Sequence, residues 1–221
     1  MLQNYRKKIE LIETGLLQII EDILSANKMM YEAENSSDYA KIDSAIEKLS
    51  NINQIAHEVD NTVVSTLALF SPEAKDLREL VAILKITNEL TRAKSSVKNF
   101  GLDIKDAYEE FIFDKSLVDK ILLLQECSIQ STEYLGMMIK STDENITQKL
   151  YDSILAQEDK ADEIYAIIDK SVIDQICDDS KISVAKVRSL KAIRRLEKIT
   201  DRCVGVAQLI MYAQTGGEIT Q

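Results

Sequence analysis

KIDSAIEKLSNINQIAHEVDNTVVST, residues 41–66, is the stretch that decides the fold class of this chain. Its apolar and small side chains recur every three or four residues, at Ile42, Ala45, Leu49, Ile52, Ala56, Val59, Val63 and Thr66. This spacing places them along one face of an α-helix. A stripe of this length is typical of a seam against neighbouring helices. The stretch is therefore predicted to be one long helix of an all-α bundle.

The same spacing continues on both sides of this stretch, over residues 9–23 and 90–104. Residues that break helices are rare, since the chain has six glycines and one proline, Pro72. We expect Ser37 and Ser71 to cap the helices that follow them. The S-x-x-E stretch at residues 141–144 resembles a capping box. Six helices of roughly 25–35 residues each are predicted.

The order of helix lengths runs twice through the chain, which indicates an internal repeat. A shift of 106 positions lays Lys85 on Lys191 and Leu90 on Leu196. We therefore expect two tandem three-helix units, residues 1–113 and 114–221. The short connections predict that consecutive helices pack antiparallel.

Charge and composition restrict the location and the partners of the chain. The net charge of −10 argues against binding to nucleic acid or to anionic lipid surfaces. No apolar run approaches the ~18 residues that span a bilayer, and the start shows no signal-peptide pattern. The three cysteines, Cys127, Cys177 and Cys203, are odd in number and far apart. These features predict a cytoplasmic protein with reduced thiols.

Two acidic pairs are the candidate metal ligands. Glu158 and Asp162 are four residues apart, as are Glu197 and Asp201, so each pair shares one helix face. If their helices pack antiparallel, the four carboxylates converge and would repel each other unless a cation lay between them. The alternative is that these acids only pair with Lys198, Arg202 and their neighbours.

Other motifs exclude most enzyme classes. His57 is the only histidine, so the chain cannot supply the two ExxH motifs of a ferritin-like di-iron site. The sequence has no P-loop and no dinucleotide-binding glycine motif. A basic stripe would dock an acidic partner or an anion, or would form a solvated face with paired charges; its members are Arg188, Lys191, Arg195, Lys198 and Arg202.

Two segments resemble the PhoU family. PEAKDLRELVAILKITNELTR, residues 72–92, is similar to the family's first repeat, which has a proline followed by Asp-Leu-Arg. LEKITDRCVGVAQ, residues 196–208, is similar to its Leu-Glu-Arg-Ile-Gly-Asp segment in the second repeat. The resemblance implies two three-helix bundles related by pseudo-twofold symmetry. It also implies a non-catalytic regulator of phosphate uptake, whose partners are the ATPase of a phosphate ABC transporter and a sensor histidine kinase.

The resemblance further implies metal binding through E(D)xxxD motifs, which Glu158, Asp162, Glu197 and Asp201 match in the second repeat. The corresponding first-repeat positions carry no carboxylate; they are Leu49, Asn53, Thr91 and Ser95. Arg78 matches an arginine of the family, and Val184 stands at the second-repeat position. The bound ion would be iron, zinc, manganese or magnesium.

Several alternatives stay open from the sequence. The carboxylates would also suit a metal-storage or metal-dependent hydrolytic protein. Alternatively, the chain would be an accessory protein of an ion-driven phosphate permease instead of an ABC transporter. A helical scaffold without a ligand is a third reading. An apolar strip left exposed on the bundle would allow the chain to form a homodimer. We expect the chain to associate with the membrane only through its partner proteins.

Overall fold

The computed structural model describes residues 2–110, 115–178 and 183–216, and these residues form helices and no strands. None of these helices combines the length and the apolar character that crossing a bilayer requires. The helices, in chain order, are α1 (Leu2–Ser36), α2 (Ala40–Lys48), α3 (Ile52–Phe70), α4 (Ala74–Glu110), α5 (Lys115–Lys140), α6 (Glu144–Asp178) and α7 (Ser183–Thr215).

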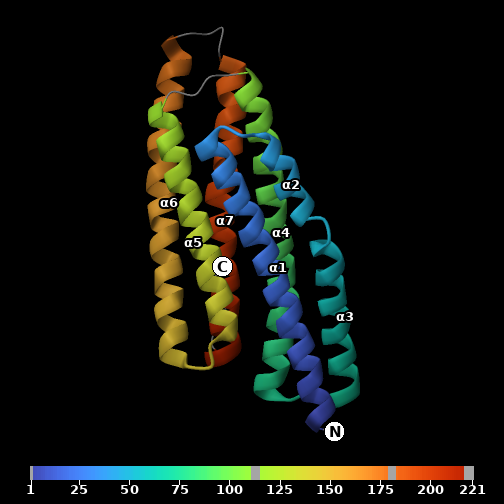
Figure 1. Ribbon diagram of the computed structural model, residues 1–221. Coiled ribbons are helices and arrows are strands. Elements are labelled where there is room, and N and C mark those ends of the chain that lie inside the picture. The colour runs from blue at the N-terminus through green and yellow to red at the C-terminus, as the bar shows by residue number, and fades with distance from the viewer. Residues whose placement is uncertain (1, 111–114, 179–182, 217–221) are drawn as a thin grey trace.

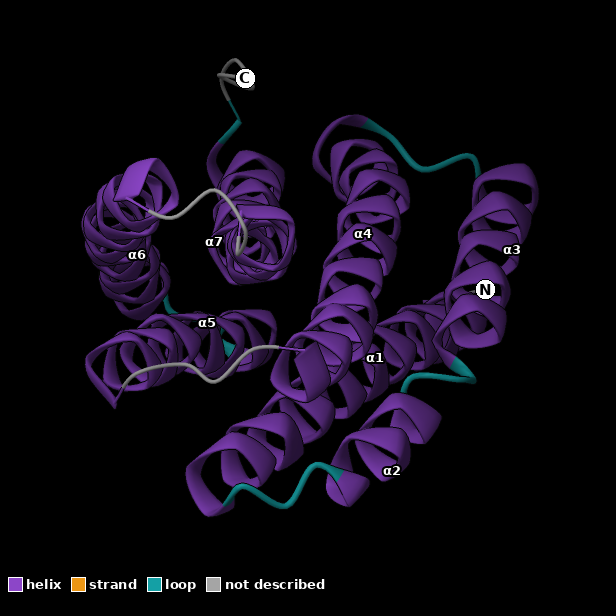
Figure 2. Cartoon of the chain, turned by 90° about the horizontal axis from the view of Figure 1, so that it is seen from above, coloured by secondary structure: helices purple, strands orange, loops and turns teal. Residues whose placement is uncertain are grey.

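The helices lie roughly along one direction and form two adjoining groups (Figures 1 and 2). Helix α1 packs against α2, α3 and α4, while α5, α6 and α7 pack against each other. The groups meet where α1 contacts α5 and where α4 runs beside α7. The predicted all-α bundle is confirmed. The division into repeats at residues 113 and 114 stays a prediction, and that boundary lies outside the described residues.

The apolar stripes of the sequence form the core. All eight positions from Ile42 to Thr66 are buried, and so is the stripe from Leu90 to Ile104. In α1, Ile12, Leu16, Ile19 and Ile23 are buried as well. Each fully buried side chain of this size contributes roughly 1.5–3 kcal/mol of transfer free energy. One continuous apolar core therefore joins the two groups of helices.

The prediction of one continuous helix across residues 41–66 is wrong, because a turn separates α2 from α3. The backbone N–H groups of Leu49 and Ser50 donate to Ile46 and Glu47, three residues back, where an α-helix would bond four back. Ser50 and Asn51 favour such turns, since their short polar side chains compete for backbone hydrogen bonds. The turn redirects the axis between α2 and α3 (Figure 1) while the apolar stripe stays buried.

The predicted caps at Ser37, Ser71 and Ser141 are also wrong. Ser37 and Ser71 end the preceding helices, with φ angles of 54° and 46° in the left-handed region. The N–H groups of Ser37 and Asp38 donate to Glu34 and Ala33 in the pattern of a Schellman motif. Helix α6 is capped by Asp143, whose Oδ1 accepts from the backbone N–H groups of residues 145 and 146. Ser141 therefore lies before the cap.

Polar contacts fix how the two groups of helices meet. Between α1 and α5, Asn27 Nδ2 donates to Ser128 Oγ at 2.8 Å, and Gln125 Nε2 donates to Asn27 Oδ1 at 3.1 Å, all fully buried. Between α4 and α7, Arg195 donates to Asp103 at 2.6 Å. Because buried polar groups must be paired, the first set fixes the register of α1 on α5.

Candidate functional site

Three of the four predicted metal ligands converge between α6 and α7. These helices lie side by side (Figure 2) and run antiparallel, as the colours of Figure 1 show and as the short connections predict. Glu158 and Asp162 project from successive turns of α6 toward Asp201 of α7. One carboxylate oxygen of each residue lies within 4.8 Å of an oxygen of each of the others. Within the described residues, this is the group of acids whose spacing suits a metal ion.

Glu197, the fourth predicted ligand, is paired differently. Its Oε1 accepts from Lys198 Nζ at 3.1 Å, and the same ammonium donates to Asp201 Oδ2. Glu197 Oε2 is buried and has no hydrogen-bond partner. The alternative that these acids pair with Lys198 therefore applies to Glu197 and to one oxygen of Asp201. Among the described residues, neither Glu158 nor Asp162 has an ion pair with a cationic side chain.

The electrostatics of the cluster match crowded carboxylates. Burial raises the pKa of Glu158, and the charges of Asp162 and Asp201 raise it further. Burial also raises the pKa of Glu197, with Asp201 adding to the shift and Lys198 opposing it. Although burial lowers the pKa of Lys198, its hydrogen bonds to Asp201 and Glu197 outweigh burial and raise it overall. The cluster therefore holds more negative charge than one lysine neutralises.

The donor set fits a divalent cation. Carboxylate oxygens are the ligands of hard ions such as Mg²⁺ and Mn²⁺, and zinc and iron also accept them. Glu158, Asp162 and Asp201 would supply three oxygens. Glu197 lies outside this converging group, although its Oε2 is buried without a hydrogen-bond partner. The ammonium of Lys198 would compete with a metal ion for these carboxylates, because it donates hydrogen bonds to Glu197 and Asp201.

The corresponding positions of the first group carry no comparable cluster. Leu49 is fully buried in the core, and Asn53 accepts a hydrogen bond from Lys94 Nζ at 3.3 Å. The hydroxyls of Thr91 and Ser95 donate to carbonyls of their own helix. These contacts are structural, in line with the missing carboxylates. His57 is exposed on α3.

Contacts between α4 and α7 involve basic side chains whose partners the sequence motifs do not indicate. Two members of the basic stripe, Arg195 and Arg202, pair with Asp103 and Glu89 of α4, so they join helices within the chain. Arg78 of α4 lies over the ring of Tyr212 in α7, with its Cζ 6.0 Å from the ring centroid. Helical spacing identifies such faces, but the register between α4 and α7 decides which charges meet.

Comparison with known proteins identifies similar sequences. The PhoU domain family matches residues 16–101. The accessory protein PhoU of the phosphate-specific transport system of Escherichia coli is 25% identical over 216 residues, which cover 97% of this chain and 84% of that protein. A PhoU homolog of Caulobacter vibrioides is 24% identical over 181 residues, or 76% of this chain and 71% of the homolog.

Solved structures share the fold. The phosphate transport system regulatory protein PhoU of Streptococcus pneumoniae superposes with a TM-score of 0.81 at 19% identity, covering 98% of this chain and 99% of the other. PhoU of Pseudomonas aeruginosa gives a TM-score of 0.69 at 18% identity, with 98% of each chain covered. At these identities the likeness bears on the fold alone.

Proposed function

Since this chain belongs to the PhoU family, we propose that it is a non-catalytic accessory regulator of phosphate transport. The observation that carries this proposal is the similarity to PhoU accessory proteins over nearly the whole chain, 97% of it in one case. The long packed helices support it too. They leave broad exposed faces for protein contact, and affinity at such faces comes from a few anchor residues.

We further propose that the chain acts in the cytoplasm on the ATPase of a phosphate ABC transporter or on a sensor histidine kinase. Its relatives are accessory proteins of the phosphate-specific transport system, which supports a transporter partner. The net charge of −10 supports protein contact over direct binding to acidic lipid headgroups. An ion-driven phosphate permease is the competing partner.

Binding to purified partners tests this proposal. We expect the chain to bind the ATPase subunit of its own phosphate transporter, or the kinase, and to ignore the ATPase of an unrelated ABC transporter. In cells that lack the chain, phosphate uptake at high external phosphate should rise and should fall again when the gene is restored. Unchanged uptake, together with no binding to either partner, would refute the proposal.

The second part of the proposal is a metal site formed by Glu158, Asp162, Asp201 and Glu197. Its support is the convergence of three carboxylates within 4.8 Å and the unpartnered buried oxygen of Glu197. A bound iron, zinc, manganese or magnesium ion would offset the repulsion that raises the pKa of Glu158 and Glu197. The metal would hold α6 to α7 and shape the surface they present.

Metal titration of chelator-treated protein tests the site. We expect saturable Mn²⁺ binding by calorimetry at neutral pH, and at least tenfold weaker binding by the Asp162→Asn/Asp201→Asn variant, since each loses a charged ligand. The matched control, Asp152→Asn/Glu163→Gln, removes the same charge from exposed positions of α6 and should bind like wild type. Equal affinity in all three proteins would rule the site out.

Metal-dependent hydrolysis is the alternative function, which the converging carboxylates favour. Two metals bridged by carboxylates activate water. Within the described residues, no histidine stands near the cluster, since His57 lies on α3. Phosphatase assays with added Mn²⁺ or Fe²⁺ separate the two functions. Activity that is lost in Asp162→Asn/Asp201→Asn would favour the enzyme over the regulator.

A further inference from the structure

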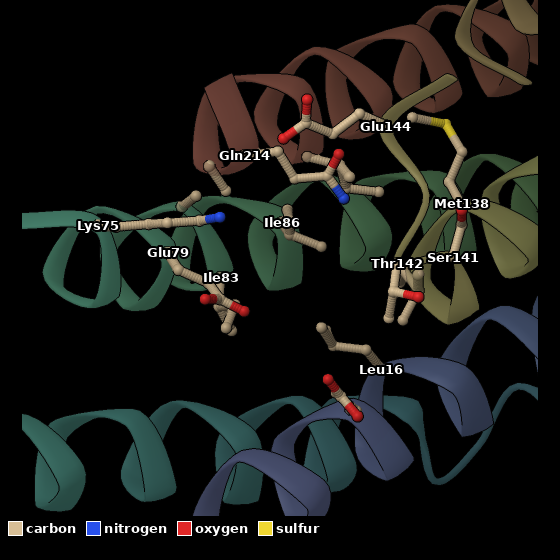
Figure 3. A pocket seen from close by; sticks show the side chains of 15 residues that line it. Leu16, Lys75, Glu79, Ile83, Ile86, Met138, Ser141, Thr142, Glu144 and Gln214 are labelled. Carbon is tan, nitrogen blue, oxygen red and sulfur yellow. The ribbon is translucent and has the colours of Figure 1, made fainter. Parts of the chain in front are cut away.

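A pocket of about 300 Å³ opens where the two groups of helices meet, at the end of the bundle that holds the α5–α6 turn. Its walls come from α1, α4, α7 and the segment between α5 and α6 (Figure 3). The volume is within the range of small-molecule sites. None of the acids of the metal cluster lines it, so the pocket is separate from the proposed metal site.

The inner wall of the pocket is apolar. It is formed by Leu16 from α1, Ile83 and Ile86 from α4, Met138 from α5 and Ile210 from α7. These side chains are at most 7% exposed, so they belong to the core itself. Side chains in such a wall are held by their packing, and an aliphatic chain that replaced water against them would gain free energy from burial. The wall therefore favours an aliphatic body.

The rim presents hydrogen-bond acceptors in excess. Glu13, Glu79 and Glu144 line it with three carboxylates, against the single ammonium of Lys75. Gln214 adds an Oε1 atom that is buried without a hydrogen-bond partner. Figure 3 shows Lys75 and Glu79 entering from α4, with Glu144 and Gln214 entering from other helices. In the described part of the chain, none of the three carboxylates has a hydrogen bond or an ion pair.

The charges at the rim interact unfavourably as they stand. Burial raises the pKa of Glu79, and the charges of Asp76 and Glu13 raise it further, while Lys75 opposes this. Burial likewise raises the pKa of Glu13. A cation between these carboxylates would relieve both effects, and an N–H donor would satisfy the unpartnered Oε1 of Gln214. A group with several N–H donors and one positive charge meets these needs together.

We propose that this pocket binds an alkylammonium group, with its aliphatic body on the apolar wall and its ammonium at the acidic rim beside Glu13 and Glu79. The ligand is either a free aliphatic amine or a lysine side chain of a protein, which share this chemistry. An anion of the same shape meets three carboxylates and is excluded. A neutral alcohol of the same length gains the apolar contact only.

Methyl NMR on the full chain, with chelator present, tests the proposal. The methyl groups of Met138, Ile83 and Ile86 are observed during titration with hexylammonium, hexanol and hexanoate. We expect a saturable shift with hexylammonium, with a dissociation constant on the order of 1 mM. Hexanol should bind at least about fivefold more weakly and hexanoate should not bind. An Nα-acetyl-lysine amide titration distinguishes the sources, because tighter binding of that compound indicates a protein side chain.

Single substitutions test whether the rim carboxylates bind the ammonium group. Glu79→Gln keeps the shape of the side chain but removes a charge, and should weaken hexylammonium binding about tenfold, the value of one charge-assisted hydrogen bond. Two controls should leave the affinity unchanged: Glu47→Gln on the exposed face of α2 and Glu158→Gln in the metal cluster. The second control separates this pocket from the proposed metal site.

Three results would overturn the proposal. The first is the absence of a saturable shift at about tenfold the expected dissociation constant. The second is equal affinity for hexylammonium and hexanol, which would make the pocket an apolar cavity without selectivity for charge. The third is unchanged binding in Glu79→Gln. None of these results depends on the phosphate-regulator function or on metal binding.

Discussion

Glu34 lies near the end of α1, where it is 2% exposed and neither of its carboxylate oxygens has a hydrogen-bond partner. Burial raises its pKa well above the usual 4.5. We predict that Glu34→Gln, which has the same shape and no titrating proton, makes the chain more stable at neutral pH. The gain should grow as the pH rises, because the free energy of unfolding of the wild-type protein falls with increasing pH.

The magnitude follows from proton linkage. Below the pKa of the unfolded chain, near 4.5, Glu34 is protonated in both states and costs nothing in ionisation. Above it, the unfolded chain releases the proton while the folded chain retains it. The free energy of unfolding then falls by up to about 1.4 kcal/mol per pH unit until the raised pKa of the folded state is reached. Between pH 5 and 7 the loss is at most about 2.7 kcal/mol.

Urea unfolding of both proteins at pH 5, 6 and 7 measures this effect. The difference in unfolding free energy between Glu34→Gln and wild type should increase with pH at a slope no greater than about 1.4 kcal/mol per unit. Glu32→Gln, an exposed position of the same helix, is the control and should give a difference that stays flat. A flat difference for Glu34→Gln as well would refute the reasoning, because it would mean that the folded chain does not retain the proton.

Two further predictions concern packing and the metal cluster. Gly15→Ala would place a Cβ 2.4 Å from Val59 Cγ2, and we expect a net loss of about 1–2 kcal/mol after the gain in helix propensity, measured by urea unfolding. Gly205→Ala, whose Cβ would find its nearest side chain at 3.9 Å, should instead gain up to about 1 kcal/mol; a loss there would contradict the packing argument. Lys198→Met removes the ammonium that competes for the carboxylates, so Mn²⁺ affinity should rise about tenfold in calorimetry. Lys191→Met, on the same helix, is its control, and an equal rise in both variants would indicate a general charge effect.

Helix content was readable from the sequence because apolar periodicity is a local property. The stripe from Ile42 to Thr66 is buried throughout, as its spacing predicts. The same stripe hid the turn at Leu49–Asn51, because a short tight turn keeps the apolar residues nearly in phase. Helix ends were misjudged for a related reason. Serine is a favoured N-cap, whereas left-handed helix ends are mostly glycine, so the residue type of Ser37 and Ser71 predicted a helix start where the backbone forms a helix end.

The candidate metal ligands were only partly predictable. Spacing of four residues put Glu158 on the same face as Asp162, and Glu197 on the same face as Asp201. Which carboxylates converge depends on the register of α6 on α7 and on which of them pair with a neighbouring cationic side chain. Lys198 pairs with both Glu197 and Asp201, and the carboxylates that converge are those of Glu158, Asp162 and Asp201.

By itself, the sequence determined the all-α class, the buried stripes and the resemblance to PhoU, because these follow from residue types at fixed local spacings. Tertiary structure alone decided where α4 meets α7 and where α1 meets α5. The amphipathic period fixes which face a helix buries, but it leaves the register and the partner of that face open. The pocket between Leu16, Glu79 and Gln214 therefore exists only in the folded chain, since residues far apart in the sequence build its wall and its rim.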